Sequence, residues 1–358
     1  MTYGETFPGQ SPGQSPGQSH GDAQGRPEAA ATDRPEVDLF CVGTLFFDLV
    51  LAGMDAMPDA GAEVWAKERA VSPGGVANRA VAAARLGLRT GLAGEVGTDM
   101  FGDHLWQVLH QVANLDLRWT SRSPDVQTTL SVSVALDGDR RFLSHGEPTW
   151  PGEAALRPER LPRARVAQVG LEAGLPDWAR HLRAEGTLLF GGVGWDPSGQ
   201  WSAEVLDNLT QFDAFVCNTT EAMAYTRTDT PTGALRRLAE RVPLAVVTDG
   251  HRGALAVDGA SGEFVSAPAV TSEAVDPTGA GDTFFAGFAY ATLAGWPLRQ
   301  RLLFANLCAS QSVRGLGGAV SAPTWDDLGA WFDATDRPTQ GAAFGFLGPE
   351  LARRRSTS

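Results

Sequence analysis

One stretch of the sequence organises this chain: Asp276-Pro277-Thr278-Gly279-Ala280-Gly281-Asp282-Thr283-Phe284-Phe285-Ala286-Gly287-Phe288. Its first half is rich in proline and glycine, which predicts a loop. Its second half has the spacing of a helix with phenylalanines on a buried side. Gly279, Ala280 and Gly281 would then lie where a helix begins. Unpaired backbone N–H groups and the positive end of the helix dipole make such a position an anion site.

Asp282 follows this anion site directly. A carboxylate there would repel a resting phosphate, so a base acting on an incoming nucleophile is the better interpretation. The alternative is that Gly279–Asp282 form a turn in which Asp282 is an ordinary helix cap.

Size and composition limit the classes of function. The chain has 358 residues, 43% of them hydrophobic, which is enough for one large α/β domain or two small ones. A net charge of −13 argues against a sequence-independent nucleic-acid binder. Apolar runs are too short to cross a membrane, and the polar N-terminus is unlike a signal peptide. Three widely spaced cysteines form no metal or redox motif, so a cytoplasmic setting is the simplest expectation.

Lys67 is the only lysine, and no Gly-x-x-x-x-Gly-Lys-Ser/Thr string occurs. A standard P-loop is therefore excluded. If the protein handles ATP, then backbone amides, a metal ion or arginines must neutralise the phosphates.

The N-terminal half of the chain contains a second candidate site. Residues 1–35 are predicted to be a disordered tail. An apolar strand ends at Gly43, and Asp48 follows it at the carboxyl end, where open α/β sheets place ligands. The two glycines of Gly74-Gly75-Val76-Ala77-Asn78 would let the chain approach a ligand, with Asn78 at the start of a helix. The alternatives are a turn aspartate and a simple helix cap.

Two more polar segments follow predicted strands. Asn218-Thr219-Thr220-Glu221 comes after the strand 212–217, and a capping box is the alternative interpretation. Thr248-Asp249-Gly250-His251-Arg252-Gly253 comes after the strand 244–247. Both segments are thus expected at carboxyl ends of strands.

The alternation of strands and helices predicts the fold class. Residues 36–335 should form an α/β domain with a doubly wound, mostly parallel sheet. Strands at about 62–72 and 117–145 are expected to form a small β lid over the substrate, an exposed hairpin being the alternative. Residues 336–358 are expected to be a solvated C-terminal tail.

The string from Asp276 to Phe288 resembles the signature of the ribokinase-like (PfkB) family of sugar and nucleoside kinases, and the other motifs occur in that family's order. The resemblance implies that Asp282 is the catalytic base and that Gly279, Ala280 and Gly281 form the anion hole. It also implies a sugar site made of Asp48, Gly74, Gly75 and Asn78. The family string is Gly-Gly-x-x-x-Asn, so the spacing here departs from it, and the departure weakens the case for ribose.

The same resemblance implies the remaining site residues. Asn218 and Glu221 would organise Mg²⁺ and its water shell, Thr248, Gly250 and Gly253 would flank ATP, and Asn306 would belong to the adenine wall. A monovalent cation, K⁺, would be held by Asp276, Thr278, Ser312, Gly315, Gly317 and Ser321.

The sequence therefore predicts ATP-dependent phosphorylation of a hydroxyl on a small sugar or nucleoside, with no nucleic-acid or membrane partner. A homodimer through the lid strands is left open. Two alternatives remain: a vitamin kinase of the same superfold, and a catalytically silent sensor of sugar or nucleotide.

Overall fold

The structure is a computed structural model that describes residues 34–136, 139–171, 174–194, 196, 198–335 and 341–356. Within it, Pro35–Ser358 form one compact unit. The tail predicted at 1–35 lies outside the described residues except for its last two positions.

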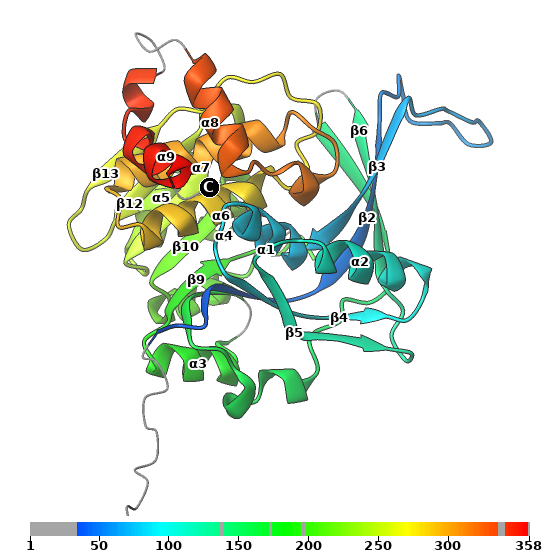
Figure 1. Cartoon of the computed structure of the whole chain (residues 1–358), viewed down its shortest axis with the longest axis horizontal. Helices are drawn as coiled ribbons and strands as arrows, with labels where there is room; N and C mark the ends of the chain where they lie inside the picture. The colour runs from blue at the N-terminus through cyan, green and yellow to red at the C-terminus, as the bar shows by residue number, and fades with distance from the viewer. Residues whose placement is uncertain are drawn as a thin grey trace, which may run out of the picture. The chain divides into compact units, whose positions relative to one another are not determined.

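The larger sheet has the strand order β13-β12-β11-β10-β9-β8-β1-β4-β5. Figure 1 labels β13, β12, β10, β9, β4 and β5 of this sheet. Neighbouring strands are parallel from β5 to β11, whereas β12 and β13 are antiparallel. Its strands are β1 Val37–Val42, β4 Thr90–Gly97, β5 Leu115–Ser123, β8 Ala164–Gly170, β9 Leu188–Gly192, β10 Ala214–Asn218, β11 Leu244–Thr248, β12 Ala254–Asp258 and β13 Phe264–Ala267. The predicted doubly wound, mostly parallel sheet is confirmed.

Helices cover both faces of this sheet because its strands are apolar on both sides. In β1, Leu39 and Cys41 enter one core cluster, while Phe40 and Val42 enter the other. The first cluster packs α1 Val76–Arg85, α2 Met100–His110, α6 Ala280–Leu293, α7 Leu298–Ser312, α8 Trp325–Ala334 and α9 Leu347–Arg355. The second packs α3 Asp177–Ala184, α4 Thr219–Thr226, α5 Pro231–Ala239 and the 3₁₀ segment Ala203–Gln211. Shorter 3₁₀ turns are Glu153–Leu156, Pro158–Arg160, Gly250–Arg252, Gly318–Ser321 and Gly341–Phe344.

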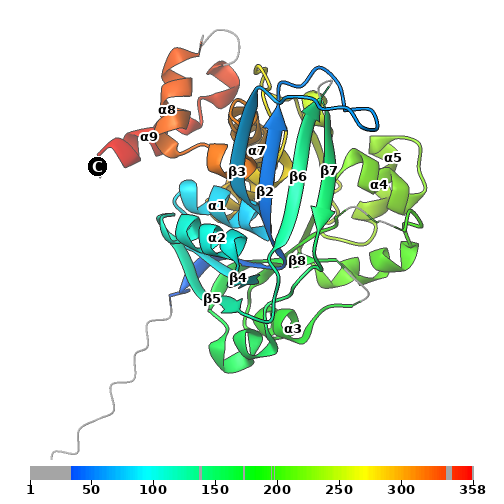
Figure 2. The same cartoon turned by 90° about the vertical axis from the view of Figure 1, so that its right-hand side faces the viewer.

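A smaller sheet has the order β3-β2-β6-β7, and Figure 2 shows these strands side by side. They span β2 Leu45–Ala52, β3 Glu68–Gly75, β6 Thr129–Leu136 and β7 Asp139–His145. This sheet is the predicted lid, but its strands differ in two respects from those that the sequence predicts. Leu115–Ser123 is not a lid strand, because it pairs in parallel with β4 in the larger sheet. Leu45–Ala52, which the sequence analysis left unassigned, joins β3 to β6.

The C-terminal segment also differs from its prediction as a solvated tail. Within 341–356, α9 buries Leu347 and Leu351 against the first core cluster. Glu350 accepts a hydrogen bond from the Tyr290 hydroxyl at 2.7 Å, and Arg354 lies over the Trp325 ring at 4.4 Å. The leucines are spaced by one helical turn among charged residues, so one apolar face is enough to dock the helix.

In the part of the chain that the structure describes, no helix combines the length and the apolar character needed to cross a membrane.

Candidate active site

The segment predicted to be an anion loop lies at the start of α6, as the sequence predicts for its position. Gly279 precedes the helix with φ 71°, and a Cβ atom there would lie 2.9 Å from Cα of Gly318. Glycine is therefore required on both conformational and steric grounds. The Ala280 amide donates to the carbonyl of Pro277 at 3.2 Å, whereas no hydrogen bond within the described chain occupies the amide of Gly281. A Cβ on Gly281 would meet open space. Among the described residues, the loop thus keeps the Gly281 amide without a hydrogen-bond partner at the helix start.

Asp276 ties this loop to the loop that follows α7. Its carboxylate is fully buried and accepts from the Thr278 amide at 2.9 Å and from the Gly317 amide at 3.0 Å. The amides of Val275 and Asp276 both donate to the carbonyl of Val313. Asp276 therefore organises the turn, whether or not it also binds a cation.

The other residues predicted to hold a monovalent cation lie together beside Asp276. The Ser321 hydroxyl is 2.8 Å from the carbonyl of Ser312 and 2.7 Å from that of Gly318. A Cβ on Gly315 would lie 2.9 Å from Cβ of Ser321. The structure thus brings these oxygen atoms close together, and the Ser321 hydroxyl donates hydrogen bonds to two of the backbone carbonyls.

Asn78 connects α1 to the same region. Its side-chain oxygen accepts from the Ala319 amide at 2.9 Å, and its side chain is buried. The helix starts earlier than predicted, at Val76, and its N-cap residue is Gly75 with φ 63°. Asn78 is thus no helix cap, which removes the alternative interpretation of this residue.

Asp48 differs from its prediction in position. It lies not at the carboxyl end of β1 but within the next strand, lid strand β2, opposite Ser72 of β3. A Cβ on Gly74 would lie 2.2 Å from both carboxylate oxygens, so Gly74 leaves the space that Asp48 occupies. Burial raises the pKa of Asp48 to about 7, and the negative charges of Asp282 and Asp276 add to this effect. A hydrogen bond from Asn78 acts in the opposite direction on this pKa.

This raised pKa predicts how stability depends on pH. An aspartate in the unfolded chain has a pKa of about 3.9. Between that value and the folded pKa of about 7, the folded state keeps a proton that the unfolded state releases, so this group's contribution to stability falls as pH rises. We expect Asp48→Asn to raise the melting temperature relative to wild type by an amount that grows from pH 4 to pH 8. Thermal unfolding of both proteins across this range is the measurement, and a difference independent of pH would contradict the assignment.

Asp282 lies in the first turn of α6 and pairs with Arg79 of α1. Its Oδ1 is 2.8 Å from Nε of Arg79, and the two side chains are 25% and 21% exposed. The guanidinium also lies 4.9 Å from the Phe285 ring centre. With its amide oriented to satisfy both of its neighbours, Gln168 accepts from Nη1 of Arg79 at 3.2 Å. Sequence reasoning missed Arg79, although it directly follows Asn78; the only available signal was its place in that motif.

A cavity of about 370 Å³ opens beside this pair. Of the predicted acceptor residues, Gly75 and Asn78 line it together with Asp282, whereas Asp48 and Gly74 do not. Its other walls come from lid strand β2 through Phe46, from the ends of β1, β8 and β9, and from Trp150. These strand ends are carboxyl ends, the position at which open α/β sheets bind ligands.

Lid strand β7 also reaches the anion loop. Arg140 donates a hydrogen bond to the carbonyl of Pro277, and the Thr278 hydroxyl lies 3.4 Å from that of Ser133 on β6. The lid and the loop are therefore in direct contact, which sequence reasoning did not anticipate.

The predicted nucleotide residues follow β10 and β11, as expected. Asn218 and Glu221 form a capping box at the start of α4, with hydrogen bonds of 2.9 and 3.0 Å. Burial raises the pKa of Glu221, and the charge of Asp282 contributes to the increase. The Thr219 hydroxyl donates to the carbonyl of Thr248 at 3.0 Å, which joins the two segments.

The other residues predicted to bind the nucleotide differ in how much free space surrounds them. A Cβ on Gly250 would meet open space, whereas one on Gly253 would lie 2.2 Å from the carbonyl oxygen of Ala267. Asn306 donates from its amide to the carbonyls of Ala267 and Pro268, each at 3.0 Å. Gly253 and Asn306 thus fix the segment after β13, while Gly250 leaves space in front of β11.

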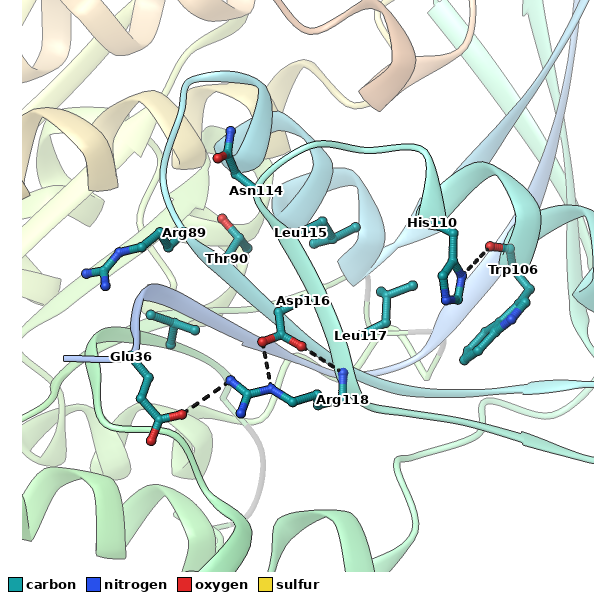
Figure 3. Close-up of a pocket in the computed structure, with 11 residues that line it drawn as sticks. Glu36, Arg89, Thr90, Trp106, His110, Asn114, Leu115, Asp116, Leu117 and Arg118 are labelled. Carbon is teal, nitrogen blue, oxygen red and sulfur yellow. Dashed lines mark hydrogen bonds and ion pairs between the residues drawn. The ribbon is translucent and has the colours of Figure 1, made fainter. Parts of the chain in front are cut away.

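A larger cavity of about 670 Å³ lies at the amino ends of β1, β4 and β5 (Figure 3). Among its charged side chains, Arg118 pairs with Asp116 at 2.7 Å and with Glu36 at 3.2 Å. No residue that the sequence analysis assigned to a site lines it. The candidate active site is therefore the smaller cavity.

The doubly wound, mostly parallel sheet and the small lid sheet define a ribokinase-like fold. Residues 38–325 match the pfkB family carbohydrate kinase, so the chain belongs to this family of phosphotransferases that act on alcohol groups. A fructokinase of Klebsiella pneumoniae is 32% identical over 284 residues, covering 72% of this chain and 90% of that protein. A ribokinase of Bacillus subtilis (strain 168) is 27% identical over 296 residues, covering 80% and 96%. The structure of Arabidopsis thaliana ribokinase complexed with ribose and ATP matches with a TM-score of 0.67 at 24% identity, covering 82% of this chain and 98% of that one, which shows the shared fold.

Proposed function

We propose that this protein transfers the γ-phosphoryl group of ATP to a hydroxyl of a small sugar or nucleoside, with Asp282 as the general base. One observation carries the proposal: Asp282 lines the smaller cavity and also lies in the first turn of α6. An acceptor hydroxyl in the cavity can therefore meet a base and an anion site at the same point.

The reaction follows from this placement. Asp282 takes the proton of the acceptor hydroxyl as its oxygen forms a bond to the γ-phosphorus, and the bond from that phosphorus to ADP breaks. The backbone of Gly279, Ala280 and Gly281 stabilises the negative charge on the transferred group. The Gly281 amide, which has no hydrogen-bond partner in the described chain, is the direct donor. Asp48 and Asn78 are assigned to the acceptor side together with Gly74 and Gly75. Gly74 leaves room for the Asp48 carboxylate, and Gly75 leaves room for the carbonyl of Thr44.

The nucleotide side offers few protein ligands for Mg²⁺, which suits an ion bound mainly through waters and phosphates. No group of three His, Cys, Asp or Glu side chains among the described residues is placed to hold a metal ion. Mg²⁺ usually binds through one or two carboxylates, several waters and the substrate phosphates. The half-buried Glu221 carboxylate, whose pKa is raised, would gain from a nearby cation and would hold it together with Asn218. When bound, the ion would neutralise phosphate charge.

The test of this function is an acceptor panel. The purified protein is incubated with ATP, Mg²⁺ and a series of sugars, nucleosides and vitamin alcohols, and ADP release is measured. We expect release that depends on a sugar or nucleoside. Turnover of a vitamin alcohol alone would favour the vitamin kinase, and binding without turnover of any acceptor would favour the silent sensor.

We further propose that K⁺ supports the anion loop. The carboxylate of Asp276 uses two of its lone-pair positions for amides, which leaves others for a cation, and carbonyl and hydroxyl oxygens lie beside it. The expected ligands are Asp276, Thr278, Ser312, Gly315, Gly317 and Ser321.

We expect KCl to raise activity above that in NaCl or in a bulky organic cation salt at equal ionic strength. The Asp276→Ala variant should lose this response, because the carboxylate is the only charged ligand in the set. Initial rates in the three salts are the measurement. Equal wild-type rates would leave Asp276 as the organiser of the turn alone.

A homodimer through the lid is the proposed assembly. The lid carries three exposed apolar side chains on its outer strands, Val71, Phe142 and Leu143. Such residues on edge strands favour association with another sheet. Light scattering of wild type and Leu143→Lys would test this, and an equally monomeric wild type would contradict it.

A further inference from the structure

The acceptor cavity holds one positive and one negative side chain among its lining residues, Arg79 and Asp282. A kinase site for an uncharged acceptor needs the base but has no evident use for the arginine. Arg79 is therefore the residue whose role in the proposed reaction is unexplained.

Three contacts fix the guanidinium of Arg79. Nε bonds to Asp282, Nη1 to the Gln168 oxygen, and the group lies against the Phe285 ring. An arginine has five N–H donors in a rigid fork. These contacts use two of them, so donors remain on a group whose orientation is already set.

The neighbouring backbone leaves these donors open to the cavity. A Cβ atom on Gly192, which also lines the cavity, would lie 3.2 Å from Nη1 and 3.7 Å from Nη2 of Arg79. A side chain at this position would therefore cover the outer edge of the guanidinium. Because Gly192 has none, a ligand can approach that edge directly.

An oriented guanidinium with donors left over recognises planar or tetrahedral oxyanions, because carboxylate and phosphate oxygens match its fork. The ion pair gives a second reason. While Asp282 accepts from Arg79, part of its capacity to accept a hydroxyl proton is occupied. An anionic substituent would offer Arg79 another partner and release the base.

On the basis of the function proposed above, we propose that the acceptor carries an anionic group, a carboxylate or a phosphate, which Arg79 binds while a hydroxyl of the same molecule lies at Asp282. The substrate class is thus a sugar acid or a sugar phosphate rather than a neutral sugar. The transfer step is unchanged: the hydroxyl oxygen bonds to the γ-phosphorus, its proton goes to Asp282, and ADP leaves.

The experiment compares matched acceptors. Values of kcat/KM are measured for neutral aldoses, the corresponding aldonates and the corresponding sugar phosphates, which separates the two anions. We expect wild type to prefer one anionic series over its neutral parents by about 10–100-fold, the range for one hydrogen bond to a charged group. Arg79→Gln should lose most of this preference through KM, and Arg79→Lys, which keeps the charge without the fork, should retain part of it.

Arg89→Gln is the matched control, since Arg89 is an exposed arginine paired with Asp38 at the other end of β1 and β4. It should keep the full preference. A wild type that phosphorylates neutral and anionic acceptors equally well would overturn the inference and leave the proposed function standing. A fall in kcat for all acceptors alike in Arg79→Gln, with the KM ratio unchanged, would make Arg79 only a positioning residue for Asp282 and would also overturn it.

A binding measurement separates this inference from the proposed function. Calorimetric titration of Asp282→Asn, in which the ion pair is lost, should show anionic acceptors binding at least as tightly as to wild type and more tightly than neutral ones. Selective binding of anions without transfer to any acceptor would sink the kinase proposal but support the anion site. Equal binding of neutral and anionic acceptors to both proteins would overturn the anion site.

Discussion

Asp282→Asn should keep the fold and the binding of ATP but lose turnover by about 10²–10⁴-fold, the usual effect of removing a general base. The amide has the same size and stays in the first turn of α6, so the anion loop should be undisturbed. The Arg79 contact loses its charge, but the side-chain oxygen of the asparagine can still accept from Nε of Arg79. Steady-state ADP release, nucleotide titration and melting temperature are the measurements.

Asp116→Asn is the matched control for this variant. Asp116 also pairs with an arginine, Arg118 at 2.7 Å, but it lines the cavity at the amino ends of the strands (Figure 3). Its turnover should equal that of wild type. Near-normal turnover in Asp282→Asn would remove the base from the proposed mechanism.

Gly279→Ala should lower kcat by about 10²–10³-fold, comparable to the loss of one anion-hole donor. The backbone at Gly279 has φ 71°, which costs an L-residue roughly 1–2 kcal/mol. The new Cβ would also lie 2.9 Å from Cα of Gly318, whose own free space is limited by the Asn78 oxygen. The loop must therefore shift, which moves its amides away from the phosphoryl group.

Gly295→Ala is the control for Gly279→Ala, because it introduces the same backbone strain without displacing a neighbouring segment. Gly295 follows α6 with φ 72°, and a Cβ there would meet open space. It should lose a similar amount of stability, seen as a lower melting temperature, while keeping its turnover. If Gly279→Ala and Gly295→Ala lose stability and activity in the same proportion, the anion loop has no special part in the reaction.

Short-range signals were enough for much of the fold. The Pro277–Gly281 loop and the helix after it depend on backbone preferences within a few residues, and the structure has both. The same holds for the capping box of Asn218 and Glu221, which lie three residues apart. Apolar runs identified most strands of the parallel sheet because these strands are buried on both faces.

The sequence by itself therefore determined the order of elements, the loop and helix start at Gly279, and the family. Only the tertiary structure decided which sheet Leu45–Ala52 and Leu115–Ser123 join, since a strand's own pattern does not name its partner. It also decided that α9 docks and that Arg79 meets Asp282, from a position 203 residues away. Such contacts arise when packing brings distant segments together, and no local preference of the backbone records which distant segment will supply the partner.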